Sequence, residues 1–144
     1  MAFRVRRALP ADLDRAYALR REVFVVEQRV PEELERDEHD AAADHVVAED
    51  EAGRCVATGR LVRIGPRTGK VGRMAVAAQV RGRGAGAAVL AELERVAAGR
   101  GLEEIVLHAQ VSAKAFYDRA GYVAEGDIFT EAGIEHVTMR KRLD

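Results

Sequence analysis

The chain has 144 residues, of which 48% are hydrophobic and 33% charged, and its formal net charge is −1 at pH 7. This size and composition are typical of one globular domain and argue against a disordered chain. The single cysteine, Cys55, excludes an intramolecular disulfide and a cluster of thiolate metal ligands. No segment approaches the roughly 20 apolar residues of a membrane helix, and the opening MAFRVRRALP lacks the apolar core of a signal peptide. We therefore expect one domain over residues 1–144, in the cytoplasm, with no membrane or nucleic-acid partner.

Opposite charges gather in different parts of the chain. Residues 32–51 contain ten Asp and Glu against one Arg, whereas residues 54–100 contain ten Lys and Arg against two Glu. Such runs are often solvated surface and nothing more. Alternatively, the acidic segment attracts a cationic amine and the basic half attracts a phosphorylated molecule. Both interpretations stay open at this stage.

The hydrophobic pattern predicts strands and helices in mixed order. In the first half we expect a strand near residues 3–5, a helix from 10 to about 26, an acidic loop with one helical turn at 32–44, and strands at 45–50, 54–64 and 71–77. In the second half we expect a glycine-rich turn followed by a helix that ends at Gly99 and Gly101, and then a strand at 105–109. A short helix capped by Ser112 and ending at Gly121 follows, and a hairpin of 122–130 with 135–142 closes the chain. This order predicts an α+β fold. Strands 71–77 and 105–109 should be parallel, because a helix connects them.

The strongest motif is the turn Arg81-Gly82-Arg83-Gly84-Ala85-Gly86, which lies between a strand and a helix. Glycines let a ligand approach the main chain, and successive N–H groups at a helix N-terminus bind anions. With two arginines beside them, these N–H groups suit a pyrophosphate. The glycine spacing differs from the Rossmann motif, and no Gly-Lys-Ser/Thr follows as in a P-loop. A plain surface turn is the bland alternative.

Arg81, Gly84 and Gly86 form an R-x-x-G-x-G signature, and in this the chain resembles the GNAT N-acetyltransferases. His108-Ala109-Gln110 and the segment 115–122 are similar to that family's fifth strand and the helix after it. The segments 24–28 and 131–136, and the acidic stretch ending at His45, resemble the ElaA-like subgroup. The resemblance implies the GNAT fold, with a mixed sheet of six to seven strands and four helices. It also implies direct acetyl transfer from acetyl-CoA to a primary amine.

The resemblance further implies which residues contact acetyl-CoA. In the family, the pantetheine arm pairs with the backbone of the fourth strand, here 71–77, where an N–H polarises the thioester carbonyl. The residues expected to bind acetyl-CoA are Met74, Ala75, Val76, Arg81, Gly82, Arg83, Gly84, Ala85, Gly86, Gln110 and Ser112. No metal is expected, because the acidic cluster near His45 lacks a recognised coordination spacing.

Two side chains are candidates for catalysis. Tyr117 lies where family members place the acid that protonates the leaving thiolate, and a phenol is protonated at neutral pH. An aromatic core residue is the alternative. His108 is the candidate base, because it shares a strand face with Gln110 and polar groups there need partners. Rival bases are Glu27, His45, Glu49 and His136, and we expect Glu27, His45 and His136 to lie near the acceptor.

Other functions remain compatible with these residues. A non-catalytic acyl-CoA sensor would keep the binding turn without the chemistry, and a nucleotide-binding protein of another fold would prefer ADP to CoA. The sequence does not identify the acceptor amine, although the acidic segment favours a cationic one. A homodimer is common in such folds and is a possible assembly here.

Overall fold

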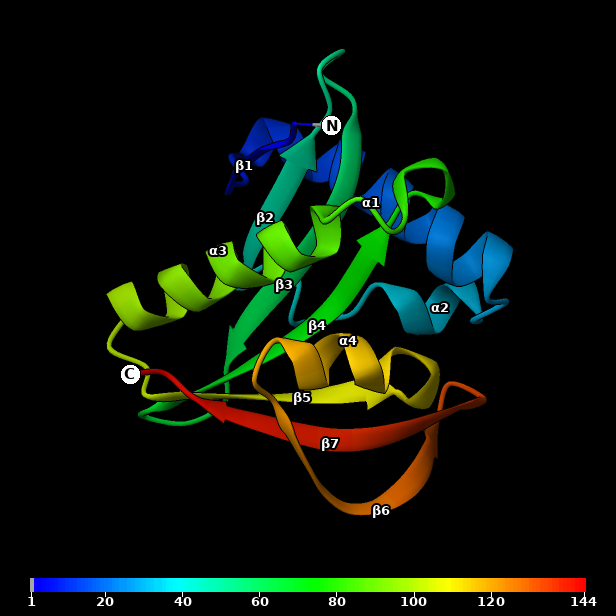
Figure 1. Cartoon of the computed structure of the whole chain (residues 1–144). Helices are drawn as coiled ribbons and strands as arrows, with labels where there is room; N and C mark the ends of the chain where they lie inside the picture. Colours follow the sequence, from blue (N-terminus) through cyan, green and yellow to red (C-terminus); the bar gives the residue numbers. More distant parts are fainter. Residues whose placement is uncertain (1) are drawn as a thin grey trace.

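In the computed structural model, which describes residues 2–144, seven strands form one mixed sheet in the order β1-β2-β3-β4-β5-β7-β6 (Figure 1). The strands are β1 (Arg4–Arg7), β2 (Asp44–Glu49), β3 (Cys55–Arg63), β4 (Thr68–Val76), β5 (Glu104–Gln110), β6 (Val123–Glu131) and β7 (Ile134–Arg142). Neighbouring strands are antiparallel except for β4 and β5, which pair in parallel. The predicted parallel pair and closing hairpin are therefore confirmed, and β7 lies between β5 and β6.

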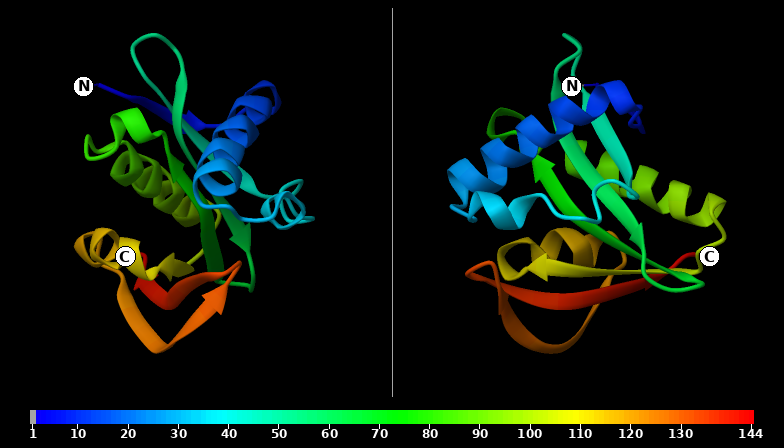
Figure 2. Two further views of the ribbon diagram at one scale, coloured as in Figure 1. Left: turned by 90° about the vertical axis from the view of Figure 1, so that its right-hand side faces the viewer. Right: turned by 180° about the vertical axis from the view of Figure 1, so that it is seen from behind.

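Helices cover both faces of the sheet (Figure 2). The helical segments are a 3-10 turn at Pro10–Asp12, α1 (Leu13–Arg20), a π-helical segment at Arg21–Glu27, α2 (Glu32–Glu35), a 3-10 turn at Ala78–Val80, α3 (Ala85–Gly99), a 3-10 turn at Val111–Ala113, and α4 (Lys114–Arg119). α3 and α4 lie on one face, and α1 and α2 lie on the other. The predicted helix 10–26 is thus a composite of three helical types. None of the helices within residues 2–144 is both long and apolar enough to span a membrane.

Each face of the sheet has its own hydrophobic core. On the α3 face, the predicted stripe of α3 packs on alternate residues of the central strands; the members include Val46, Leu61, Val71, Val89, Leu90, Leu93 and Leu107. On the α1 face, Leu19, Val23 and Phe24 pack against Val56 and Ala75. The alternation along each strand therefore decides which side chains reach which face.

One predicted detail of the α4 region is wrong. Ser112 does not cap the short helix, since its side chain is exposed within the 3-10 turn Val111–Ala113 and α4 begins without a side-chain cap. The 3-10 turn instead continues directly from β5 into α4. The start of α4 is therefore determined by the 3-10 turn that precedes it, and no side-chain hydroxyl caps the helix.

The pairing of β4 with β5 stops halfway along the two strands. The last pair is Val71 with Leu107, and beyond it the strands diverge (Figure 1). A β-bulge lies at this point, because the register with β3 shifts between Thr58 and Arg60, and Arg73 has a φ of 53°. A bulge bends its strand away from the ladder. Residues 72–76 of β4 and 108–110 of β5 therefore face each other without a ladder, and we call this region the strand opening.

Buried arginines neutralise much of the acidic segment. The Arg20 side chain, 1% exposed, donates to Glu35 Oε2 at 2.8 Å and to Asp40 Oδ1 at 2.7 Å. Arg60 donates to Asp37 and Asp40 at 2.7 and 2.8 Å. Burial disfavours the Asp40 carboxylate, but hydrogen bonds from Arg20 and from the Asp37 backbone hold its pKa well below the usual range.

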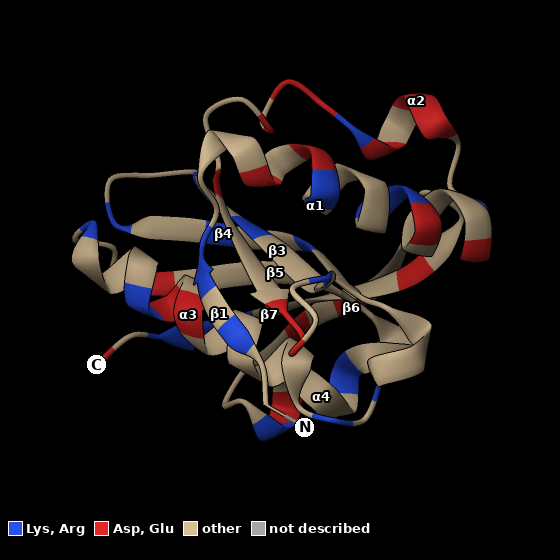
Figure 3. Cartoon of the chain, turned by 90° about the horizontal axis from the view of Figure 1, so that it is seen from above, with Lys and Arg blue, Asp and Glu red and all other residues tan. Residues whose placement is uncertain are grey.

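The interpretation of this segment as an open acidic surface is therefore largely wrong. Seven of its carboxylates are paired with arginine, namely Glu32, Glu35, Asp37, Asp40, Asp44, Glu49 and Asp50. Figure 3 shows the acidic residues of α2 and of the segment after it lying beside α1. The acidic run stabilises the loop between α1 and β2, and it supplies little free negative charge.

We predict that Arg20→Met lowers the free energy of unfolding by about 3–5 kcal/mol, because it leaves the carboxylates of Glu35 and Asp40 buried without their partner. The neighbouring Arg21→Met is the matched control. Its ion pair with Glu32 is exposed, so the change should be below about 1 kcal/mol. Urea denaturation of both variants measures the difference, and equal midpoints would contradict a structural role for Arg20.

Candidate active site

The glycine-rich turn presents an open main-chain surface at the start of α3. Gly82 and Gly84 have φ values of 79° and 91°, and a Cβ at either position would meet nothing within 4 Å. α3 begins at Ala85 without a side-chain cap, so the N–H groups of its first turn have no intrahelical acceptor. These groups point out of the helix end and can bind an anion. The backbone angles and the open space therefore both suit a phosphate group.

Gly86 is needed for a different reason. A Cβ at this position would lie 3.3 Å from Val76 Cγ2 and 3.5 Å from Phe116 Cζ. The glycine therefore lets the first turn of α3 pack closely against the end of β4 and against α4. This contact brings the turn and the strand opening side by side.

The Arg81 side chain is already engaged within the protein. Its Nη1 and Nη2 donate to the two oxygens of Glu27 at 2.9 and 2.7 Å, and its Nε donates to the Val76 carbonyl at 3.0 Å. The hydrogen bonds from Arg81 lower the pKa of Glu27 below its ordinary value. Glu27, expected to bind the acceptor, thus joins the π-helical segment to the glycine-rich turn instead.

The end of β4 combines packed side chains with an available backbone edge. Ala75 is buried, while Met74 and Val76 are half-buried against the two cores. β3 pairs with one edge of this segment through Ala57 and Thr58. The other edge faces the strand opening, where β5 is not its partner. The backbone of residues 74–76 therefore leaves one edge available to an extended ligand.

Two histidines and a carboxylate meet at the end of β5. The register pairs Gln110 with His136, and the β6–β7 turn at Ala132 and Gly133 brings Glu131 back over β5. Glu131 Oε1 lies 3.0 Å from His108 Nδ1, and Glu131 Oε2 lies 3.8 Å from His136 Nε2. Burial is the largest single influence and raises the pKa of Glu131, but the hydrogen bond from His108 and the charges of neighbouring groups together outweigh it, and the net shift is downward. Three strands therefore build one cluster.

Gln110 closes one end of the strand opening. Its amide exchanges hydrogen bonds with Gln28, at 2.9 Å in one direction and 3.5 Å in the other. Gln28 follows the π-helical segment, so this pair joins the helical layer to the tip of β5. Gln110 was expected to bind acetyl-CoA, but in this structure its side chain is engaged with Gln28.

Tyr117 on α4 combines a buried ring with an accessible hydroxyl. Its ring packs edge-on against Phe116 and Tyr122, and burial raises its pKa to about 12. Within residues 2–144, every fully buried side-chain oxygen or nitrogen has a hydrogen-bond partner. No residue within 2–144 is a hydrogen-bond partner of the Tyr117 hydroxyl, so its oxygen keeps some exposure to solvent. The phenol is therefore protonated, held by its ring and free to donate.

The structure does not bring His45 or Glu49 to the strand opening. His45 is buried on β2, which is two strands away from β4 on the side opposite to β5. Its Nε2 lies 2.9 Å from the Asp40 carbonyl oxygen. Glu49 pairs with Arg15 at 2.9 Å and with Arg6 at 3.3 Å. Both residues stabilise the α1 side of the fold, which corrects the expectation that His45 binds the acceptor.

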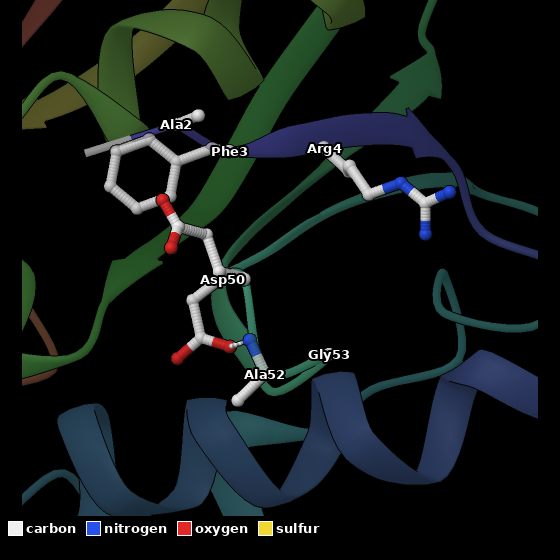
Figure 4. A pocket seen from close by; sticks show the side chains of 7 residues that line it. Ala2, Phe3, Arg4, Asp50, Ala52 and Gly53 are labelled. Carbon is white, nitrogen blue, oxygen red and sulfur yellow. Dashed lines mark hydrogen bonds between the residues drawn. The ribbon is translucent and has the colours of Figure 1, made fainter.

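A separate hollow lies beside β1, at the edge of the sheet formed by that strand (Figure 4). It is lined by Ala2, Phe3, Arg4, Asp50, Glu51, Ala52 and Gly53, from β1 and the β2–β3 turn. The Asp50 carboxylate accepts a hydrogen bond from the Ala52 backbone N–H at 3.0 Å and so serves the turn itself. None of the residues of the strand opening or of the glycine-rich turn lines this hollow.

Sequence reasoning did not assign a function to Glu131 or Gln28. Both residues lie in segments that resemble the ElaA-like subgroup, but the signal was only the similarity of those segments. Their roles depend on contacts across 23 and 82 residues of chain. Only the strand order could have revealed them.

Comparisons with known proteins agree with this geometry. The chain matches the family model of the acetyltransferase (GNAT) domain over residues 10–143. It is 39% identical over 127 residues to the uncharacterized N-acetyltransferase YjcF of Bacillus subtilis, covering 88% of this chain and 89% of YjcF. A solved structure from Lactobacillus plantarum, described as an N-acetyltransferase, has a TM-score of 0.91 and 29% identity and covers 99% of both chains. Escherichia coli ElaA shares the fold, with a TM-score of 0.82 and 22% identity over 97% of this chain and 98% of ElaA. The chain therefore belongs to the GNAT acetyltransferase family.

Proposed function

We propose that this protein transfers the acetyl group of acetyl-CoA directly to a primary amine. The observation that carries the proposal is the continuity of two binding surfaces. The free edge of residues 74–76 leads through a short 3-10 turn into the glycine-rich turn and the N-terminus of α3. An extended arm that ends in a pyrophosphate fits such a surface, and the GNAT family uses acetyl-CoA.

In this proposal, the main chain holds most of the donor. N–H and C=O groups of Met74, Ala75 and Val76 pair with the pantetheine arm, and the turn N–H groups bind the pyrophosphate. Arg83 is exposed, whereas the Arg81 guanidinium is held by Glu27 and Val76. Arg83 is therefore the cation that approaches the phosphates. Arg81 stabilises the glycine-rich turn through its bonds to Glu27 and Val76. Ser112, exposed after β5, is the remaining side chain proposed to contact the donor.

The proposed reaction needs two proton transfers. The neutral amine nitrogen attacks the thioester carbonyl carbon, a C–N bond forms, and the C–S bond breaks. His108 takes the proton that the amine nitrogen loses, directly or through a water. Tyr117 gives its proton to the departing thiolate, which a protonated phenol can do at neutral pH. An N–H of residues 74–76 stabilises the negative charge on the carbonyl oxygen.

The proposal leaves the charge of the acceptor open. The expectation of a cationic amine relied on free carboxylates in residues 32–51, and seven of these are paired with arginine. Electrostatic steering by that segment is therefore weak. The acceptor is defined here only as a primary amine that enters the strand opening.

We predict that Gly84→Asp weakens CoA binding by about tenfold or more, because it places a carboxylate where the pyrophosphate would bind. Asp tolerates positive φ, so the fold should survive. Gly101→Asp is the matched control, since Gly101 also has positive φ and open space but lies at the other end of α3. Calorimetry measures the affinity of each variant for CoA. Equal affinities in the two folded variants would reject the glycine-rich turn as the pyrophosphate site.

We predict that Tyr117→Phe lowers kcat by about 10²–10⁴-fold and leaves CoA affinity unchanged, because the ring stays in place while the proton donor is lost. Tyr122→Phe is the control, since the Tyr122 hydroxyl donates to Glu94 at 2.8 Å, away from the strand opening. Thiol release from acetyl-CoA with a panel of amines measures both. Wild-type turnover in Tyr117→Phe would show that Tyr117 is only a structural residue of the hydrophobic core. If none of these proteins turned over, the result would favour a non-catalytic acyl-CoA sensor.

We also predict that Tyr117 stays protonated far above neutral pH. Burial disfavours the phenolate and raises the pKa of Tyr117 to about 12, so no ionisation of this residue is expected between pH ~9 and ~11, around the ordinary tyrosine pKa of about 10. Ultraviolet difference spectra of the wild type against Tyr117→Phe test this directly. A tyrosinate signal that titrates near pH ~10 and is lost in the variant would contradict the buried phenol.

A further inference from the structure

The geometry points to Glu131 as the positioning residue of His108, holding the imidazole with its proton on Nδ1 so that Nε2 is free to accept the proton of the amine. This inference rests on the proposed acetyl transfer and deepens it. It assigns a role to Glu131 on β6, a carboxylate to which the sequence analysis assigned no function.

The hydrogen bond itself determines the tautomer. Glu131 Oε1 lies 3.0 Å from His108 Nδ1, and an ionised carboxylate can only accept. The shared hydrogen therefore belongs to Nδ1, and the neutral ring carries its lone pair on Nε2. Without such a partner, a histidine can exchange between its two tautomers, only one of which presents the base on the required side.

Neighbouring groups hold both partners in place. The Phe129 ring packs edge-on against His108, with 5.0 Å between ring centroids, and stacks on His136. His136 Nδ1 donates to the Ile134 carbonyl at 2.7 Å, so the neutral ring turns its unprotonated Nε2 toward Glu131 Oε2 at 3.8 Å. That contact becomes attractive when His136 is protonated. The positive charge of Lys70 on β4 also lowers the pKa of Glu131 and so favours its carboxylate form.

The location of the pair matches the proposed chemistry. His108 is the first residue of β5 beyond the last β4–β5 pair, Val71 with Leu107. Leu107 and Ala109 are buried in the core under α3, so the intervening His108 faces the α1 side of the sheet. Tyr117 belongs to the core on the α3 face. The base and the acid therefore lie on opposite faces, with the strand opening between them.

The test uses three variants in the full-length protein. Glu131→Ala removes the acceptor, Glu131→Gln keeps one carbonyl oxygen, and Glu135→Ala changes an exposed carboxylate on the same hairpin. We expect Glu131→Ala to lower kcat by about 10–100-fold, the effect seen when a metal-binding histidine loses the carboxylate that orients it. The KM for acetyl-CoA should stay constant, Glu131→Gln should recover part of kcat, and Glu135→Ala should match the wild type.

A spectroscopic measurement separates positioning from stability. The ¹⁵N chemical shifts of His108 should report a proton on Nδ1 in the wild type and in Glu135→Ala, and a loss of that preference in Glu131→Ala. Wild-type kcat or an unchanged tautomer in Glu131→Ala would overturn the inference. If the wild type releases no thiol with any amine, the proposed function fails instead, while the ¹⁵N spectra still decide whether Glu131 sets the tautomer of His108.

Discussion

The candidate site depends on the point at which β4 and β5 stop pairing. After Val71 and Leu107, the bulge at Arg73 turns β4 away from β5 and leaves two strand edges free. A positive φ at a non-glycine residue costs on the order of 1–3 kcal/mol, so other contacts must maintain it. The Arg73 side chain supplies them, because it donates to the carbonyls of Glu35 and Leu34 at 2.9 and 3.2 Å and to Asp37 at 3.2 Å.

The acidic segment has a structural role, because its residues bind the arginine at the bulge. Arg20, Arg60 and Arg73 come from α1, β3 and β4, and all three bind carboxylates or carbonyls of residues 34–40. A buried charge without a partner is strongly unfavourable, so each group requires the others. The loop between α1 and β2 is thereby locked against the bulge. The charges that the sequence analysis placed near a substrate instead stabilise the bulge that forms the strand opening.

The sequence predicted the parts of the fold that local rules govern. The glycine-rich turn, the apolar stripe of α3 and the hairpin at Ala132 and Gly133 follow from backbone freedom and hydrophobic period, and each is present. The length of β4 and the π-helical end of the first helix were missed, because tertiary contacts decide where such elements end. The Arg81–Glu27 pair was missed for the same reason, since 54 residues separate its members.

The strand order is what the sequence could not supply, and the site depends on it most. A simple hairpin extension would place β6 beside β5, but β7 occupies that position and β6 forms the edge. This insertion puts His136 beside Gln110, and the turn between β6 and β7 places Glu131 beside His108. Cys55, by contrast, lies on β3, and burial raises the pKa of its thiol, which disfavours a thiolate nucleophile. Cys55 therefore offers no activated nucleophile for a covalent acyl-enzyme, which is in keeping with the direct attack by the amine proposed above.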